Sequence, residues 1–433
     1  MRMVDIINKK KRGTSLSPDE ISYVIKSYTN GTIPDYQMSS LLMAIYFAGM
    51  DDDETAKLTD SIANSGEKLD LTRVGGMKID KHSSGGVGDK LSLIIVPLCA
   101  GVGIPVAKIS GRSLGHTGGT IDKLESIKGF KTELSEEEFL DNLAKYKMAI
   151  TSQTGNLAPA DKKIYALRDV TGTVDSIPLI ASSIMSKKIA SGCDGIVLDV
   201  KVGTGAFMKT LDGALALAKT MVGVGKRLGK TTVALVTDMS QPLGNEVGNA
   251  NEVKEAIEVL KGSGPEDVMT IAISIASYMA VISGLFEKPD EAYGYLTEFI
   301  KSGAALEKFA ELIRVQGGDT RIICDTSLLP KATNHIEIKA TRTGFVNSID
   351  AEDIGLAAML LGAGRKTVKD SIDYAAGITV NRKVGDGVEK GDNLCILHTN
   401  LERWDQAQKL AFRAYTIGDE KPDAVKYIHK VVV

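Results

Sequence analysis

Residues 81 to 89 read KHSSGGVGD, a polar, glycine-rich stretch between a run of strand-forming residues and a helical pattern. The strand is expected at Met77 to Asp80, and the helix at about Lys90 to Gly101. Glycines let a backbone approach a ligand closely, and a helix N-terminus offers free N–H groups and a favourable dipole to an anion. The stretch therefore indicates an α/β domain and makes this turn a candidate anion site. A glycine-rich turn that binds nothing is the alternative.

A second polar, glycine-rich loop follows the next expected strand, Val106 to Ile109. It runs from Ser110 to Glu125 and reads SGRSLGHTGGTIDKLE. The carboxyl ends of parallel strands face one crevice, where open α/β sheets bind ligands, so both loops are expected to contact one phosphate. The other charged residues of this loop are expected to brace it in an internal polar network, namely Arg112, His116, Asp122, Lys123 and Glu125.

The rest of the chain divides into three kinds of segment. Strands and helices alternate around the two loops, which predicts a mainly parallel sheet covered on both faces. The first 65 or so residues are helical instead, and Ser17-Pro18-Asp19-Glu20 has the pattern of a capping box. Helical patterns return after the second loop, and short strands dominate near the C-terminus.

The predicted fold class is α/β, with a discontinuous small all-helical domain, a larger α/β domain with a mainly parallel central sheet, and a strand-rich C-terminal α+β subdomain. The helical domain is expected at 1–66 and 162–193. The α/β domain is expected at 67–161 and 194–330, and the C-terminal subdomain at 331–433.

Composition argues against several classes of protein. The 433 residues include 52 basic and 55 acidic side chains, so no field of one sign favours a polyanion or a membrane surface. The apolar runs are too short to span a membrane, and no secretion signal is recognised at residues 1–11. Four widely spaced cysteines suit a reducing cytoplasm, and all four are expected in the core. A soluble, cytoplasmic protein is therefore expected.

The second helical segment contributes a third set of polar residues. Ser183 and Lys187 are four residues apart, so one face of a helix presents both. The planar guanidinium of Arg168 and the ammonium of Lys187 suit the carbonyl oxygens of a flat heterocycle. An ordinary solvated surface is the alternative that the spacing leaves open.

These motifs resemble those of the thymidine and pyrimidine-nucleoside phosphorylase family, the second structural class of nucleoside phosphorylases. The similar stretches are 81–89, 110–125 and 168–188, in the order and at the spacing of the family, and the likeness extends over the whole chain. The resemblance implies phosphorolysis of uridine, thymidine or deoxyuridine to free base and an α-sugar 1-phosphate with inversion, without an organic cofactor. It assigns phosphate binding to Lys81, His82, Ser83, Ser92, Lys108, Ile109, Ser110 and Thr120. It assigns base binding to His82, Arg168, Ser183 and Lys187, of which His82, Arg168 and Lys187 are catalytic.

The resemblance also implies a homodimer formed through the helical domains and a potassium ion. The ion's ligands would be Gly88, Lys90, Leu243, Glu246 and Glu255. Position 90 departs from the family, whose loop reads KHSTGGVGDTTT, because Lys90 has no side-chain acceptor and carries a positive charge. We expect its stem to turn to solvent while its carbonyl binds the ion. The alternative is that its ammonium fills the place of the ion.

Three other functions are considered. A strict thymidine phosphorylase differs only in rejecting the 2′-hydroxyl, and Lys108 favours the broader pyrimidine-nucleoside type. A phosphoribosyltransferase of the anthranilate type resembles the family in fold but needs an acidic pair for magnesium. A non-catalytic nucleoside-binding or carrier protein is suggested by residues 384–392, which resemble a carrier hairpin without the Met-Lys-Met-like tripeptide.

Overall fold

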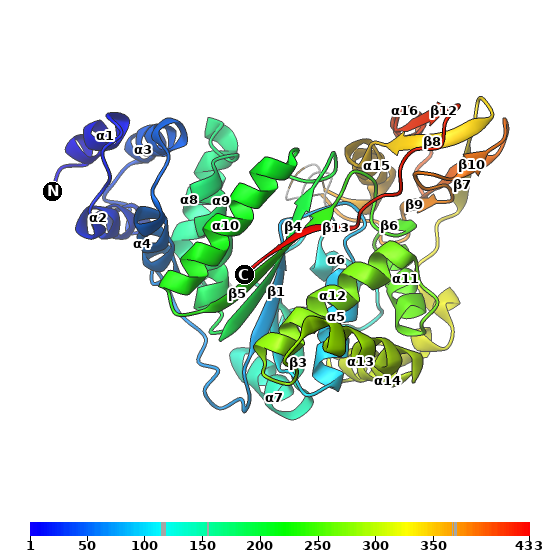
Figure 1. Cartoon of the computed structure of the whole chain (residues 1–433), viewed down its shortest axis with the longest axis horizontal. Coiled ribbons are helices and arrows are strands. Elements are labelled where there is room, and N and C mark those ends of the chain that lie inside the picture. Colours follow the sequence, from blue (N-terminus) through cyan, green and yellow to red (C-terminus); the bar gives the residue numbers. More distant parts are fainter. Residues whose placement is uncertain (114–117, 154–155, 366, 368–369) are drawn as a thin grey trace.

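The computed structural model describes residues 1–113, 118–153, 156–365, 367 and 370–433. Figure 1 shows a helical bundle on one side, a body of strands and helices in the middle, and a strand-rich region on the other side. This arrangement follows the fold class expected from the sequence.

The helical bundle combines the first helices of the chain with two later ones. Its members are α1 (Met3–Lys11), α2 (Pro18–Thr29), α3 (Asp35–Ala48), α4 (Asp52–Ala63), α8 (Pro159–Thr171) and α9 (Ile177–Ala190). The expected capping box is confirmed, because the Ser17 hydroxyl accepts from the Glu20 backbone N–H while the Glu20 carboxylate accepts from the Ser17 N–H at 2.6 Å. Buried side chains of the bundle form one core with α10 and with one face of the central sheet.

The middle body contains two sheets and the helices that cover them. The strands are β1 (Ile79–Ser83), β2 (Val106–Ser110), β3 (Met148–Ser152), β4 (Gly195–Val202) and β5 (Thr231–Asp238). The helices are α5 (Leu91–Gly101), α6 (Thr120–Glu125), α7 (Glu136–Tyr146), α10 (Leu211–Arg227), α11 (Ala250–Leu260), α12 (Glu266–Ile282), α13 (Pro289–Lys301) and α14 (Ala304–Val315). β1, β4 and β5 are neighbours in a parallel sheet, and β2 pairs in parallel with β3. Helices α12 to α14 are not among the elements expected from the sequence.

The C-terminal region forms two small antiparallel sheets, in the orders β6-β9-β11-β7 and β10-β8-β12. Its elements are β6 (Glu246–Gly248), η1 (Thr320–Ile323), η2 (Thr326–Leu328), β7 (Asn334–Lys339), β8 (Gly344–Ile349), α15 (Ala351–Ala358), η3 (Met359–Ala363), β9 (Gly377–Val380), β10 (Gly387–Val388), β11 (Asn393–Thr399), α16 (Asp405–Arg413) and β12 (Tyr415–Gly418). β6 comes from the middle body, so the two regions share a sheet.

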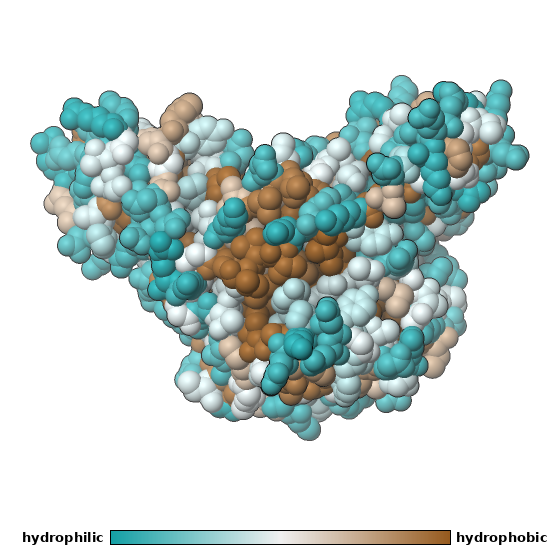
Figure 2. Space-filling view, viewed as in Figure 1, coloured by the Kyte–Doolittle hydropathy of each residue, from teal (hydrophilic) through white to brown (hydrophobic). Residues whose placement is uncertain are grey.

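The last strand, β13 (Ile428–Val432), does not stay with the C-terminal strands to which the sequence assigns it. It returns to the central sheet and pairs antiparallel with β5. Figure 2 shows apolar residues gathered at the centre of this face, where β13 runs in Figure 1. A half-buried strand such as β13 suits the edge of a sheet. The sequence does not indicate which sheet, because its partner β5 is far away in the chain.

Two further observations concern the class of protein. No helix in the described part of the chain is long and apolar enough to cross a membrane. The expectation that all four cysteines lie in the core is wrong for Cys324, which is exposed between η1 and η2, whereas Cys99, Cys193 and Cys395 are buried.

A buried ion pair inside the helical bundle gives a test of its packing. Lys10 and Glu54 are bonded at 2.8 Å with side chains only 3% and 2% exposed, and Glu54 also accepts from the Leu16 N–H. Lys10→Met would leave the Glu54 charge buried without its partner, so we expect a loss of about 3–5 kcal/mol in the free energy of unfolding.

Urea denaturation followed by circular dichroism measures this loss. Lys57→Met is the control, because the Lys57–Asp60 pair is about one-third exposed and should change stability by about 1 kcal/mol or less. Equal losses in the two variants would contradict the assignment of Lys10 to the core of the bundle.

Candidate functional site

A cavity of about 250 Å³ opens at the carboxyl ends of β1, β2 and β3. Both glycine-rich loops line it, and α9 of the helical bundle supplies one wall. The lining residues are His82, Ser83, Gly85, Gly86, Asp89, Ser92, Lys108, Ile109, Ser110, Gly111, Arg112, Gly118, Gly119, Thr120, Gln153, Leu157, Lys187 and Lys188. The two loops therefore meet at one site, as parallel strand topology requires.

Seven of the eight expected phosphate-binding residues line this cavity, and the eighth lies beneath it. Lys81 is 2% exposed, with its ammonium 3.5 Å from the Asp199 carboxylate and 3.7 Å from that of Asp89. The seven others supply hydroxyl groups, an imidazole, an ammonium and backbone atoms to one volume. Such a set of donors, with several cations and one carboxylate at the wall, suits a phosphate-sized anion.

Buried carboxylates balance the lysines below the cavity. Lys188 donates to Asp80 at 2.6 Å and to the Ile109 carbonyl at 3.3 Å. Lys201 lies 2.9 Å from Asp199, and both side chains are fully buried in β4. No role is expected from the sequence for Asp80, Lys188, Asp199 or Lys201. The signal for Asp80, Asp199 and Lys201 is charge inside strands that should be apolar, since parallel strands covered on both faces are normally hydrophobic.

Burial and nearby positive charges lower the pKa of two groups at the cavity. Burial, followed by the charges of Lys188 and Lys108, lowers the pKa of His82 well below its usual value. His82 is therefore a neutral imidazole at neutral pH, with one N–H to donate. Burial and the charge of Lys188 lower the pKa of Lys108 to about 7, and an anion in the cavity would favour its charged form.

The charged residues of the second loop form the expected internal network. Arg112 makes a two-pronged contact with Glu125, and Asp122 accepts from the Ser113 N–H at 2.6 Å. Asp122 also accepts from Arg365 of the C-terminal region at 2.8 Å, and Lys123 pairs with Glu252 at 3.2 Å. The bracing role is confirmed for these four residues, while His116 lies outside the described residues.

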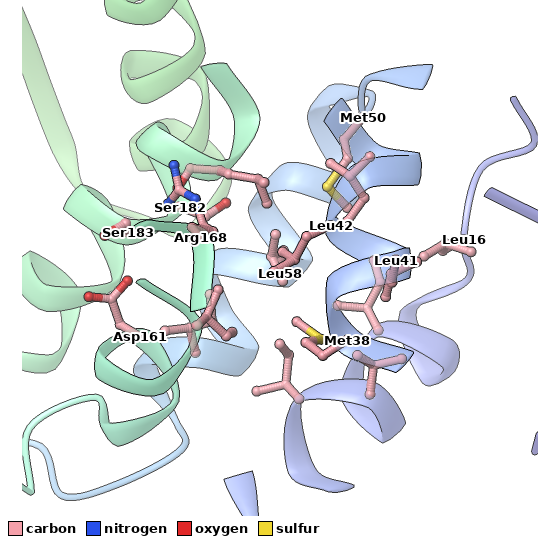
Figure 3. Close-up of a pocket in the computed structure, with 17 residues that line it drawn as sticks. Leu16, Met38, Leu41, Leu42, Met50, Leu58, Asp161, Arg168, Ser182 and Ser183 are labelled. Atoms are coloured by element: carbon pink, nitrogen blue, oxygen red, sulfur yellow. The ribbon is translucent and has the colours of Figure 1, made fainter. Parts of the chain in front are cut away.

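The expected base-binding residues do not all meet at the cavity. His82 and Lys187 line it, and the Lys187 ammonium contacts Asp161 at 2.7 Å and the Ser183 hydroxyl at 3.2 Å. Arg168 and Ser183 instead line a small cavity of about 20 Å³ inside the helical bundle, with apolar residues of α3 and α4 opposite (Figure 3).

Arg168 is 1% exposed, which corrects the idea that it presents its guanidinium to a ligand in this conformation. Its three nitrogens donate to the backbone carbonyls of Thr173, Val174 and Leu179. Thr173 and Val174 lie in the linker between α8 and α9, and Leu179 lies in the first turn of α9. The guanidinium therefore ties this linker to the start of α9. Spacing along a helix could not reveal these partners.

The residues assigned by resemblance to a potassium ion do converge, but around a lysine. Lys90 has 0% exposure, so the expectation that its stem turns to solvent is wrong. Its ammonium donates to the carbonyls of Leu243 at 2.8 Å and Glu246 at 2.9 Å, and to the Glu255 carboxylate. The Gly88 carbonyl accepts from the Lys90 backbone N–H at 2.9 Å.

These oxygens therefore already have a cationic or N–H donor, and the residues present do not fit a metal ion at the same point. Burial by itself would lower the pKa of Lys90, but the charges of Glu255 and Glu252 outweigh it and raise that pKa. Among the described residues, no three His, Cys, Asp or Glu side chains gather closely enough to hold a metal.

Comparison with known proteins covers most of the chain. Residues 75–306 match the family described as glycosyl transferase family, a/b domain, and residues 4–66 match its helical bundle domain. Residues 345–418 match the pyrimidine nucleoside phosphorylase C-terminal domain.

Similar proteins are found over the full length. The pyrimidine-nucleoside phosphorylase of Staphylococcus epidermidis is 54% identical over 432 residues, and that of Staphylococcus aureus strain MSSA476 is 53% identical over 433 residues, in both cases with 100% of each chain covered. The crystal structure of anthranilate phosphoribosyltransferase from Thermus thermophilus is similar in fold alone. It has a TM-score of 0.59 and 18% identity, over 72% of this chain and 98% of that chain. The chain belongs to the pyrimidine-nucleoside phosphorylase family.

Proposed function

We propose that the protein catalyses the reversible phosphorolysis of uridine, thymidine and deoxyuridine, giving the free base and α-(deoxy)ribose 1-phosphate. The observation that carries this proposal is the cavity in which two loops with anion-binding character face Lys187 of the helical bundle. Family membership supports the same reaction. The substrates are inorganic phosphate and a pyrimidine nucleoside.

Phosphate binds where the hydroxyl groups and cations converge. Ser83, Ser92, Ser110 and Thr120 donate hydroxyl hydrogens to its oxygens, and Lys108 supplies charge at the wall of the cavity. Lys81 acts from below, where its contacts with Asp89 and Asp199 fix the position of its ammonium. This arrangement holds the attacking oxygen still, so the reaction does not have to immobilise it in the transition state.

The departing base is stabilised by donors on the opposite side. As the C1′–N1 bond stretches, the sugar gains oxocarbenium character and negative charge develops on the carbonyl oxygens of the base. His82 donates as a neutral imidazole, and Lys187 donates as a charged group, at the place where this charge appears. Phosphate attacks C1′ from the opposite face, so the product has inverted configuration and no side chain serves as a nucleophile.

Arg168 and Ser183 take part only after the helical bundle moves toward the cavity. In the present conformation the Arg168 guanidinium holds the backbone that joins α8 to α9. A closing motion of the bundle, with a local change at 173–179, would bring this side chain to the base. Such a motion would also exclude water from the reacting atoms.

The protein forms a homodimer through its helical bundle. α1 and α3 border a hollow lined by Ile7, Met43, Phe47 and Ala48, and Phe47 is 81% exposed. An exposed aromatic residue beside other apolar side chains is typical of a protein interface.

The reaction needs no organic cofactor, and the compartment proposed for it is the cytoplasm.

A strict thymidine phosphorylase is the alternative within the same family. It differs in whether the 2′-hydroxyl of the sugar is tolerated, and uridine and thymidine assayed side by side would distinguish the two specificities.

Release of the base should depend on the co-substrate. The purified protein should release uracil from uridine and thymine from thymidine only when phosphate is present, because phosphate is the attacking group. Chromatography of the products with and without phosphate measures this. Equal release in phosphate-free buffer would identify a hydrolase, and turnover of inosine would contradict the assignment of the base site.

Two substitutions separate the base site from the phosphate site. Lys187→Ala should lower kcat/KM by about 10²–10³-fold, because a donor to the leaving base acts mainly in the transition state. Ser83→Ala should chiefly raise the KM for phosphate.

Steady-state kinetics in both substrates separates these effects. Lys162→Ala is the control, since this lysine is exposed on α8 and should have normal kinetics. Normal kinetics in Lys187→Ala would contradict the role of Lys187 as a donor to the base.

A substitution at Phe47 tests the dimer. Phe47→Asp places a charge in the proposed interface, so the variant should sediment as a monomer at concentrations at which the unchanged protein is a dimer. Val170→Asp is the control, because Val170 is 78% exposed on α8 and lies outside the hollow. A monomeric unchanged protein, or a dimeric Phe47→Asp variant, would contradict this interface.

A further inference from the structure

Lys90 places a cation between two segments that are far apart in the sequence. It follows the first glycine-rich loop and precedes α5, whereas its three acceptors come from residues 243–246 and from α11. An ammonium has three N–H donors, so the carbonyls of Leu243 and Glu246 and the carboxylate of Glu255 satisfy all of them. These bonds tie the end of the loop to a second layer of the protein.

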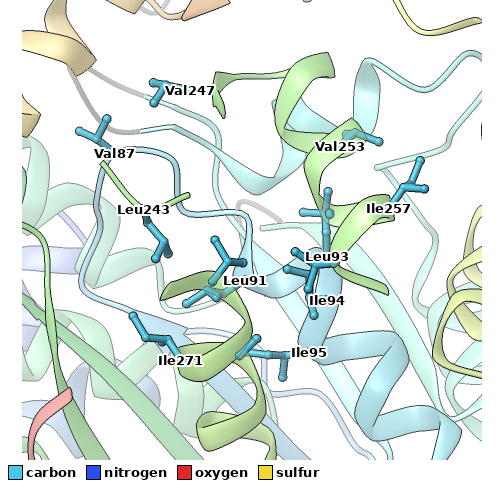
Figure 4. Close-up of a cluster of buried hydrophobic side chains, with 14 of the residues drawn as sticks. Val87, Leu91, Leu93, Ile94, Ile95, Leu243, Val247, Val253, Ile257 and Ile271 are labelled. Carbon is cyan, nitrogen blue, oxygen red and sulfur yellow. The ribbon is translucent and has the colours of Figure 1, made fainter. Parts of the chain in front are cut away.

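This ammonium is fully buried, and the carboxylates of Glu255, Glu252 and Asp267 act on it. The residues next to Lys90, Glu246 and Glu255 in the sequence include members of the buried hydrophobic cluster drawn in Figure 4, namely Val87, Leu91, Leu243, Val247, Val253 and Ile257. Glu255 is 5% exposed, and it also accepts from the Asn245 backbone N–H at 2.8 Å. A buried ion pair held in this way resists salt, but it is costly to break because one charge would remain buried.

The backbones on both sides of Lys90 come too close for side chains. Gly88 has a φ of +75°, and a Cβ there would lie 2.5 Å from the Leu243 carbonyl oxygen. Gly244 has a φ of +71°, and a Cβ there would lie 2.8 Å from the Lys90 ammonium. A backbone bond from Leu243 N–H to the Val87 carbonyl, at 3.0 Å, joins the same two segments. The first glycine-rich loop and the segment 243–246 therefore pack closely around the Lys90 ammonium.

We propose that the Lys90 ammonium is a built-in monovalent cation that holds the phosphate-binding loop on the 243–246 segment, so that this enzyme needs no bound potassium. Lys90 is a positioning residue, since among the described residues its side chain bonds to Leu243, Glu246 and Glu255, which do not line the cavity. It acts through the loop and through α5, which carries Ser92. A tethered cation is present at any salt concentration, whereas a free ion must be bound from solution.

This inference rests on the proposed function only for its kinetic readout. The thermal readout is independent, because any ion that binds the folded state selectively must raise its melting temperature. Failure of the proposed function would abolish turnover in every salt and leave the thermal comparison intact.

The first measurement uses the unchanged protein. We expect the melting temperature, the kcat and the KM for phosphate to be the same in potassium, sodium and choline chloride at matched ionic strength. A higher melting temperature and faster turnover in potassium than in choline would overturn the proposal, whatever the behaviour of any variant.

The second measurement uses Lys90→Thr, which removes the ammonium and offers a hydroxyl oxygen. In choline chloride we expect a lower melting temperature and a rise of about tenfold in the KM for phosphate, equivalent to about 1.4 kcal/mol. Potassium or ammonium ions should reverse both effects, because a free cation can then occupy the vacated position.

Lys261→Thr is the matched control. It removes the same charge at the end of α11, where the Lys261 side chain pairs with Glu258 at the surface, and should respond to no ion. A loss in Lys90→Thr that no cation reverses would reduce Lys90 to a structural residue and overturn the proposal. A Lys90→Thr variant that behaves like the unchanged protein would do the same. If this variant does not fold, the comparison of salts on the unchanged protein still decides.

Discussion

The need to place several positive charges around one anion site, without leaving any of them unpaired in the interior, governs the centre of this structure. A buried lysine without a partner would lose its charge or destabilise the fold, so each one below the loops has a carboxylate close by. Pairs with almost no exposure near the loops include Lys81–Asp199, Lys188–Asp80, Lys201–Asp199, Lys90–Glu255 and Lys123–Glu252. These pairs set the positions of the loops before any substrate arrives, which is the preorganisation that electrostatic catalysis requires.

The same pairs join parts of the chain that are distant in sequence. Lys188 of α9 reaches Asp80 of β1, so the helical bundle is tied to the strand that leads into the first loop. Its neighbour Lys187 then faces the cavity. Asp122 of the second loop binds Arg365 from the C-terminal region. The candidate site thus has contacts with all three regions of the fold.

The conformation described here keeps two of the proposed base-binding residues away from the cavity. Lys187 faces the cavity from α9, while Arg168 and Ser183 lie inside the bundle against apolar residues. An arginine bonded to three backbone carbonyls stabilises the turn between α8 and α9 in this state. If Arg168 exchanged those bonds for bonds to the base, closure of the bundle would be coupled to binding of the base. The guanidinium would have hydrogen-bond partners in both states.

The amino-acid sequence was sufficient for the features that depend on near neighbours. The capping box of α2, the two glycine-rich loops after β1 and β2, and the return of a helical segment at α8 and α9 all follow from local spacing. The two loops line one cavity because they follow β1 and β2, which lie next to each other. The eight phosphate residues were assigned by the family resemblance, and seven of them line this cavity. Tertiary contacts were needed for the rest. The burial of Lys90 and the position of β13 beside β5 depend on partners far away in the chain. The backbone partners of Arg168 are near in sequence, but they lie beyond the end of α8, where helical spacing does not reveal them. A charged side chain has the same local pattern whether it lies in water or against a buried carboxylate, because the free energy that chooses between the two comes from the distant partner.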